Sequence, residues 1–376
     1  MFAFFVTIVV FLKSKKVFII NQNYMRTVTS LFLIAFLAFQ VNCYSQIATS
    51  KIDSIIGQTF KENEPGGVFL VAKGQEVLYR KAFGKANLEL EFAMQPDFVF
   101  EIGSMTKQFT AVAIAMLQEQ GKLDFEDEIV QYIPDYPTQG NKITIHHLLT
   151  HTSGIKDFTK IKAINEIAKK EVTPQELIAF FKEEPMDFKP GEMYKYNNSG
   201  YVILGSIIEI ISGQSYAEFI QENIFKPLHM NSSSYASHEK IIKKRASGYH
   251  LKEEFVNNTF ISFSLPYASG SLLSTVDDLL KWQIALEAHT LVQQKTKEMI
   301  FKNYTLNNGE AIGYGYGWHI TKRDESLSYE HGGSIFGFKS MAVYLPEEKI
   351  YVVGLSNCDC HSPTTIVKDI ASLYRN

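Results

Sequence analysis

The hydrophobic positions of this chain recur in two periods, one helical and one extended. After Ser104, apolar residues return every three or four positions as far as Gln120, and this spacing predicts a helix that ends at Gly121. Ser274 is the expected N-cap of another helix. The helical spacing predicts further helices over residues 52–60, 144–150, 174–182, 201–211, 215–225, 274–286 and 366–373.

Extended patterns lie at the two ends of the chain. Residues 68–73 and 76–83 flank Gly74-Gln75, which predicts a β-hairpin. Short β-rich runs follow near the C-terminus, over residues 316–321, 328–330, 338–345 and 349–356. These patterns predict an α/β (α+β) fold, in which both ends build one antiparallel sheet flanked by helices. An all-helical lobe over roughly residues 122–290 is then an insertion, and its boundary is a suitable place for a ligand cleft.

Composition and charge narrow the classes of function. The 376 residues carry a formal net charge of -3, so the chain has no basic field for binding nucleic acid. Hydrophobic residues make up 45% and charged residues 20%, which is ordinary for a globular protein. We therefore expect a small-molecule or peptide substrate as the partner, and no nucleic acid.

The first 45 residues have the pattern of a targeting region. From Met25, a charged start and an apolar run lead to small residues, which is the layout of a secretory signal. We expect a targeting region over residues 1–45, a mature domain over residues 46–376, and an exported, periplasmic or cell-envelope location. Two alternatives stay open, lipidation at Cys43 and a membrane anchor formed by residues 1–24, which otherwise precede the true start.

Cysteine and histidine residues give no metal pattern. Cys358 and Cys360 are followed by His361, but a metal site needs more ligands, and the cysteine count excludes a simple disulfide elsewhere. His147 and His151 stand four apart without the glutamate of the zincin pattern, so we interpret both as structural. We expect no metal and no other cofactor.

Ser104 and Lys107 place a hydroxyl and an amine on one face of the predicted helix, one turn apart. A serine is a poor nucleophile unless a neighbouring base takes its proton. A lysine in a dry pocket can lose its own proton and serve as that base. Alone, the pair also fits an N-cap serine followed by a solvated lysine, so its meaning depends on the motifs downstream.

Two later motifs complete a set in a specific order. They are Tyr196-Asn197-Asn198, ahead of a predicted helix, and His331-Gly332-Gly333-Ser334, at the end of a short predicted strand. Together with Ser104-x-x-Lys107, they make the chain resemble the superfamily of serine β-lactamases and penicillin-binding proteins. The chain looks most like the class C branch, with its D-aminopeptidases, D,D-carboxypeptidases and esterases. The resemblance runs from about residue 52 onward and includes residues 148–155 and 268–274.

This resemblance implies a β-lactamase/transpeptidase-like fold and a set of catalytic roles. Ser104 would be the acylated nucleophile, and Lys107 would accept or relay its proton. Tyr196 would act as the base, with its phenolate favoured by the nearby ammonium. Asn198 would hold Lys107 and the substrate amide.

The resemblance also implies an oxyanion hole and a substrate-binding strand. The backbone N–H groups of Ser104 and Ser334 would stabilise the oxyanion, beside Gly333 and His331. His331 stands where β-lactamases and transpeptidases usually have lysine. Because a histidine near its reference pKa is only partly charged at neutral pH, efficient β-lactamase activity is in doubt.

The implied function is a serine hydrolase that forms an acyl-enzyme on amide or ester bonds. Peptidoglycan-type D-amino-acid peptides, esters and weakly bound β-lactams are the substrate classes. The alternative is a non-catalytic or slowly acylating penicillin-binding sensor of the same fold. A Ser-His-Asp hydrolase is less suitable, because the chain has no Gly-x-Ser-x-Gly pentapeptide.

Overall fold

The computed structural model describes residues 49–323 and 326–375. The fold described below is that of the unit Ile52–Asn376. The predicted targeting region, with Met25 and Cys43, lies outside the described residues. Within the described ranges, no helix is both long and apolar enough to cross a membrane.

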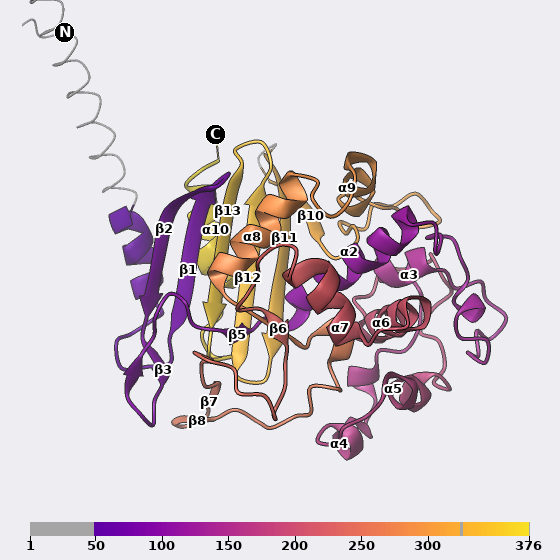
Figure 1. Cartoon of the computed structure of the whole chain (residues 1–376), viewed down its shortest axis with the longest axis horizontal. Helices are drawn as coiled ribbons and strands as arrows, with labels where there is room; N and C mark the ends of the chain where they lie inside the picture. Colours follow the sequence, from indigo (N-terminus) through magenta and orange to yellow (C-terminus); the bar gives the residue numbers. More distant parts are fainter. Residues whose placement is uncertain (1–48, 324–325, 376) are drawn as a thin grey trace, which may run out of the picture. The chain divides into compact units, whose positions relative to one another are not determined.

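A six-stranded antiparallel sheet is built from both ends of the chain, as the sequence predicted (Figure 1). β1 pairs with β2 through the predicted hairpin and with β13 on its other side, in a register that joins Gly67 to Ser356. The strands, in spatial order, are β10 (His319–Arg323), β11 (Ser326–Ile335), β12 (Phe338–Leu345), β13 (Ile350–Ser356), β1 (Gly67–Lys73) and β2 (Glu76–Phe83).

Helices cover both faces of this sheet, so that its central strands β12, β13 and β1 are buried along most of their length. On one face, α8 (Val276–Glu287) packs against β1 and β13, with Trp282 in a large core cluster. On the other face, α10 (Thr364–Ser372) packs against β12 and β13. Its Ile366, Val367 and Ile370 share a second cluster with Ile56 of the helix at residues 49–57. Burying apolar area in this way is the main stabilising contribution to such a fold.

The nucleophile helix begins with a 3₁₀ turn, η1 (Gly103–Met105), and continues as α2 (Thr106–Glu119). Most of α2 is buried, and it contacts α6 (Asn198–Ser212) of the helical region. The helix ends at Glu119, two residues before Gly121, whose φ of 67° is the left-handed conformation that the sequence predicted there.

The remaining helical elements lie mostly beyond the β10 edge of the sheet (Figure 1). They are η2 (Ile129–Gln131), α3 (Ile145–Leu149), η3 (Phe158–Lys160), α4 (Ile164–Ile167), α5 (Pro174–Phe181), α7 (Tyr216–Ile220), the π-helical turn η4 (Gln221–Phe225), η5 (Tyr267–Ser269) and α9 (Gln294–Ile300).

The region from 122 to 290 is not purely helical. α8, near its end, belongs to the layer that covers the large sheet, and short strands lie before it. The small sheets are β3 (Lys85–Asn87) with β4 (Phe92–Ala93), β5 (Phe100–Glu101) with β9 (Leu272–Ser274) and β6 (Ser234–Tyr235), and β7 (Tyr249–Leu251) with β8 (Phe255–Asn257).

Of the predicted boundaries that differ from the structure, two have a clear physical reason. β11 does not stop at Glu330 but continues through the glycine pair to Ile335, because Gly332 and Gly333 keep pairing with β12. α8 is capped by Thr275 rather than Ser274: the Thr275 side chain accepts the N–H of Asp278, while Ser274 belongs to β9.

Candidate active site

Ser104 stands in η1, and a glycine brings this turn against the sheet. Gly103 has a φ of 52°, a conformation that residues other than glycine rarely adopt. A Cβ atom added to Gly103 would lie 2.9 Å from the backbone nitrogen of Ser334. The glycine therefore lets the nucleophile's backbone approach β11 closely.

Lys107 follows one turn later and is completely buried. Its Nζ atom lies 3.2 Å from Oγ of Ser104, 2.9 Å from Oδ1 of Asn198 and 2.9 Å from the carbonyl oxygen of Ser269. The amide and carbonyl oxygens can only accept hydrogen bonds. A neutral Lys107 amine would therefore donate its two hydrogens to them, which leaves its lone pair directed at the Ser104 hydroxyl.

The orientation of the Asn198 amide is fixed by Asp157. Asn198 Nδ2 donates to Oδ2 of Asp157 over 3.0 Å, and the Asn198 backbone N–H donates to the same oxygen over 3.1 Å. Thr159 occupies the other carboxylate oxygen through its N–H and its hydroxyl. Because Nδ2 faces Asp157, Oδ1 must face Lys107.

Burial controls the protonation of the lysine. Removal from water lowers the pKa of Lys107 to about 7, and the negative charge of Asp157 opposes this shift. The rings of Tyr196 and Tyr201 lie 4.8 and 5.5 Å from Nζ, so aromatic faces take the place of water around the amine. At neutral pH a large fraction of Lys107 is therefore in the form that accepts a proton.

Tyr196 also lies beside the nucleophile, but it keeps its proton, whereas Lys107 readily loses its own. Burial raises its pKa well above 10, and the Ser104 hydroxyl opposes this only in part. The Tyr196 hydroxyl is buried, and none of the described residues lies within normal hydrogen-bond distance of it. The family resemblance implied a phenolate here, whereas the structure favours a protonated phenol next to a neutral amine.

Beside Ser104, no strand of the described ranges pairs with the β11 edge on the β10 side. Pairing between β10 and β11 ends at His319 and Glu330, so the segment from His331 to Ile335 pairs only with β12 among the described strands. A Cβ on Gly333 would lie 2.0 Å from the carbonyl oxygen of Ile102, which explains the glycine at this position. The close approach leaves the N–H groups of Ser104 and Ser334 as candidates for an oxyanion hole.

His331 lies at the edge of the cleft but is almost completely buried. The residue is 2% exposed, Nδ1 lies 2.6 Å from the carbonyl oxygen of Gly332, and Nε2 lies 3.1 Å from the Tyr314 hydroxyl. The carbonyl accepts a hydrogen from Nδ1, so Nε2 accepts from Tyr314 in the neutral ring. Burial lowers the pKa of His331 well below 6.5, and His319 and Lys107 add to this shift.

Two hollows meet at the nucleophile. A cavity of about 360 Å³ is lined by Ser104, Tyr196, Asn198 and Ser334. Most of its other lining side chains are apolar, among them Phe158 and Leu265. A second hollow of about 300 Å³ shares Ser104, Tyr196 and Ser334 with it and continues to His331, Lys339 and Thr364. Because the two hollows meet at the nucleophile, each of them can hold one side of a scissile bond.

The structure brings all the predicted site residues together around Ser104, and it adds three that sequence reasoning missed. Asp157 orients Asn198, the Ser269 carbonyl binds Lys107, and Asp359 lines the larger cavity. Asp157 follows the segment at 148–155, and Ser269 stands in the segment at 268–274. Both segments were recognised in the sequence, but a backbone carbonyl and a positioning carboxylate leave no pattern of their own.

The histidine pair at 147 and 151 is structural, as predicted. His147 Nδ1 accepts the N–H of Thr144 in a capping box at the start of α3. His151 Nδ1 accepts the backbone N–H of Asn197, and its ring lies 4.3 Å from that of Tyr196. The His151 ring therefore packs against the Tyr196 ring.

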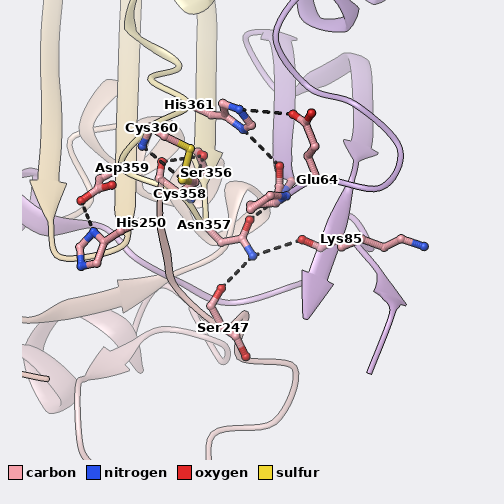
Figure 2. Close-up of a disulfide and its surroundings, with 12 residues drawn as sticks. Glu64, Lys85, Ser247, His250, Ser356, Asn357, Cys358, Asp359, Cys360 and His361 are labelled. Carbon is pink, nitrogen blue, oxygen red and sulfur yellow. Dashed lines mark hydrogen bonds and ion pairs between the residues drawn. A yellow bond between two sulfur atoms is a disulfide. The ribbon is translucent and has the colours of Figure 1, made fainter. Parts of the chain in front are cut away.

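Cys358 and Cys360 form a disulfide with each other, a pairing that the sequence prediction did not include (Figure 2). Two cysteines separated by one residue fit a pair of metal ligands as well as a small disulfide ring, so their spacing alone does not distinguish the two. Both sulfur atoms are used in the bond, so neither is free to bind a metal. Among the described residues, no group of three or more histidine, cysteine or acidic side chains could hold a metal ion.

A sequence profile of the family described as Beta-lactamase matches residues 52–367. The chain belongs to the β-lactamase family. Members of this family are usually serine hydrolases, and the arrangement around Ser104 in this β-lactamase relative has the parts that such chemistry needs.

Similar proteins come from several organisms. The chain is 30% identical to "Penicillin-binding protein 4*" of Bacillus subtilis over 79% of this chain and 69% of that protein. A penicillin-binding protein homologue from Pyrococcus abyssi, described as octameric, is 33% identical, with a TM-score of 0.76 over 86% of this chain and 76% of the other. The D-amino acid amidase of Ochrobactrum anthropi, in complex with L-phenylalanine amide, is 25% identical, with a TM-score of 0.72 over 86% and 94%.

The curated relatives are longer than this chain. The chain spans 65–69% of the length of those it matches first. Similarity therefore concerns the β-lactamase-like domain, and the activities of the whole relatives carry over only as proposals.

Proposed function

We propose that this protein is a serine hydrolase that forms an acyl-enzyme at Ser104 and cleaves amide or ester bonds of peptidoglycan-type D-amino-acid compounds, with weak action on β-lactams. One observation carries the proposal. Lys107 is buried and has a pKa of about 7. Two acceptor oxygens hold its amine so that the lone pair points at Ser104 Oγ, 3.2 Å away.

The acylation step follows from this geometry. Neutral Lys107 takes the proton of Ser104 as Oγ attacks the substrate carbonyl carbon. The carbonyl oxygen becomes an oxyanion and receives hydrogen bonds from the backbone N–H groups of Ser104 and Ser334. When the intermediate collapses, the bond to the leaving group breaks and the leaving nitrogen or oxygen needs a proton. The protonated Tyr196 hydroxyl supplies it and regains a proton from Lys107.

Deacylation repeats these steps with water as the nucleophile. Lys107, neutral again, accepts a proton from water, directly or through Tyr196, and the hydroxide equivalent attacks the acyl carbon. Ser104 leaves and recovers its proton, so the cycle consumes one water molecule and releases an acid. Each proton in this cycle is held by a side chain already placed beside Ser104.

The relatives support the proposed substrate class. Their printed names include penicillin-binding proteins and a D-amino acid amidase, both compatible with amide or ester cleavage by an activated serine. The buried, neutral His331 gives no fixed cation where β-lactamases usually have lysine. This agrees with weak rather than efficient action on β-lactams.

The test is a substrate panel on matched variants. Nitrophenyl esters, D-Ala-D-Ala peptides, D-amino acid amides and nitrocefin would be assayed on wild type, Ser104→Ala and Ser212→Ala. Ser212 is a suitable control, because it lies at the opposite end of α6 from Asn198, roughly 21 Å away by helix geometry. We expect turnover in wild type and Ser212→Ala and its loss in Ser104→Ala.

Mass spectrometry completes the test. A fluorophosphonate should add once, on the peptide that contains Ser104. One burst of product without turnover would show a slowly acylating sensor instead. No reaction with any ester, amide or fluorophosphonate would overturn the proposal.

We also propose that the protein is exported. The signal-like pattern from Met25 and the Cys358–Cys360 disulfide both support this, because disulfides persist in oxidising compartments. N-terminal sequencing of protein from its native host tests the idea. A cytoplasmic chain that retains the pattern intact would contradict it.

A further inference from the structure

The loop between β13 and α10 carries a charged residue to the active-site cavity. The disulfide between Cys358 and Cys360 encloses Asp359, and Figure 2 shows this side chain beside His250. Asp359 lines the same cavity as Ser104, although the two are far apart in the sequence. The mechanism proposed for Ser104 gives this carboxylate no task.

The charge state of the Asp359–His250 pair follows from its hydrogen bonds. The backbone N–H of Thr259 donates to Nε2 of His250 over 2.9 Å, so Nε2 carries no hydrogen. The hydrogen of the ring is then on Nδ1, which donates to Oδ2 of Asp359 over 2.6 Å. In this arrangement the imidazole is neutral, and the pair keeps the full negative charge of the carboxylate.

The rest of the cavity does not balance that charge. The lining is otherwise uncharged and includes apolar side chains from three segments, among them Phe158, Ile261, Leu265 and Phe336. Within the described part of the chain, the side chain that donates a hydrogen bond to Asp359 is that of His250. The Asp359 side chain is 31% exposed, so a ligand can reach it, and the apolar walls around it reduce the screening of its attraction for a cation by water.

The loop holds the carboxylate in a fixed place. Cys358 is fully buried, and the Asp359 N–H donates to the carbonyl oxygen of Tyr249 over 3.3 Å. Immediately before this disulfide, the Asn357 side chain donates to backbone carbonyls, including that of Ser247 at 2.8 Å (Figure 2). A charge positioned before the ligand arrives loses little entropy on binding, which favours affinity and selectivity.

We propose that Asp359 determines specificity by binding an ammonium group in the acyl part of the substrate. The inference rests on the proposed serine-hydrolase function and names its substrate class, acyl groups that carry a free amine. The amine can be the α-ammonium of a D-amino acid or the side-chain ammonium of a diamino acid. Both present the same cation to Asp359, so the test must separate them.

The experiment compares matched substrates on matched variants. D-phenylalanine p-nitroanilide and its N-acetyl form differ in the α-ammonium. The N-acetyl p-nitroanilides of D-lysine and D-norleucine differ in a side-chain ammonium. For wild type, kcat/KM should favour the ammonium-bearing member of at least one pair by roughly ten- to hundredfold, the usual effect of a hydrogen bond to a charged group.

Asp359→Asn should remove that preference, because kcat/KM should fall more for the ammonium-bearing member of a pair than for its neutral partner. The amide oxygen can still accept the His250 hydrogen, so the loop should fold normally. Glu64→Gln is the control, since Glu64 lies 3.6 Å from His361 near the same loop but does not line the cavity. This variant should keep the wild-type preference.

Two results would overturn the inference. One is a wild type that treats both members of each pair alike, and the other is a preference that survives Asp359→Asn. The pair that shows the preference identifies which ammonium is bound.

Binding to Ser104→Ala separates this inference from the proposed function. Calorimetry would compare D-phenylalaninamide and N-acetyl-D-lysinamide with N-acetyl-D-phenylalaninamide, with and without Asp359→Asn. If an ammonium ligand binds more tightly through Asp359 although wild type turns nothing over, the site is supported and the hydrolase proposal fails. If wild type hydrolyses esters but no ammonium ligand is preferred, only the inference about Asp359 fails.

Discussion

The side-chain oxygen of Asn198 lies 2.9 Å from Nζ of Lys107, while the nitrogen of the same amide donates to Asp157. Asn198 therefore transmits the position of a carboxylate to the amine without bringing the two charges into contact. Lys107 stays buried and easily deprotonated, and its lone pair stays directed at Ser104. The ability of the site to accept a proton thus depends on side chains from three separate segments.

The activity of wild type should rise as pH increases from about 6 to 8. Burial lowers the pKa of Lys107 to about 7, so below that pH the amine is protonated and cannot accept the Ser104 proton. The measurement is kcat/KM against pH for a neutral nitrophenyl ester. Lys107→Arg should lose activity on the order of a hundredfold or more and should lose the acid limb. A flat wild-type profile across pH 7 would exclude Lys107 as the base.

Asp157→Asn should move the acid limb to lower pH. The negative charge of Asp157 raises the pKa of Lys107, so its removal lets burial lower that pKa further. The maximal rate should also fall, because an amide at 157 no longer fixes Asn198 in one orientation. Asp187→Asn is a suitable control, since Asp187 pairs with Lys156 and Lys195 and does not line the cavity. A limb that stays at the wild-type pH would show that Asp157 does not act on Lys107.

Much of this fold could be predicted from periodicity, because β1 and β12 have the patterns of buried strands and β1 is joined to β2 by a clear turn. The order of the three motifs also indicated which residues meet. The sequence could not show how the β11 edge meets Gly103, because that close approach depends on two glycines and on a strand that stops pairing at His319. The protonation states of Tyr196 and His331 could not be predicted from the sequence either, because burial and neighbouring groups set their pKa values.

Tyr196→Phe should discriminate between substrates by their leaving groups. Burial raises the Tyr196 pKa, so the phenol is protonated and can donate to a departing amine. Turnover of a D-amino acid amide should fall by on the order of a hundredfold or more. A nitrophenyl ester should lose much less, because nitrophenolate leaves without a proton. Equal losses on both would instead favour Tyr196 as the base that activates Ser104.

The affinity for substrates that end in a carboxylate should not weaken between pH 6 and 8. His331 is buried, and its pKa lies well below 6.5, so it is already neutral throughout this range and loses no charge as pH rises. Profiles of KM for a carboxylate peptide and a neutral ester should be parallel. A peptide-specific rise in KM would show that His331 titrates there after all.

Lys339 is the cation we expect such a carboxylate to meet. It lies opposite Ser334 in the β11–β12 register and lines the hollow next to Ser104. Lys339→Met should raise KM for the carboxylate peptide by roughly tenfold, in line with a charged hydrogen bond, and spare the ester. An equal change for both substrates would assign Lys339 to folding rather than to substrate binding.

The pairing of the two chain ends has a consequence for synthesis. The Gly66 N–H donates to Asn357 Oδ1 over 2.6 Å across a separation of 291 residues, and β1 needs β13 as its neighbour. Contacts of such long range form late, since a large loop must close first. Ser104, at the start of the nucleophile helix, also depends on β11 for its second N–H donor. A chain still leaving the ribosome therefore has its nucleophile but no site, so hydrolysis can begin only after translation has delivered the last strands.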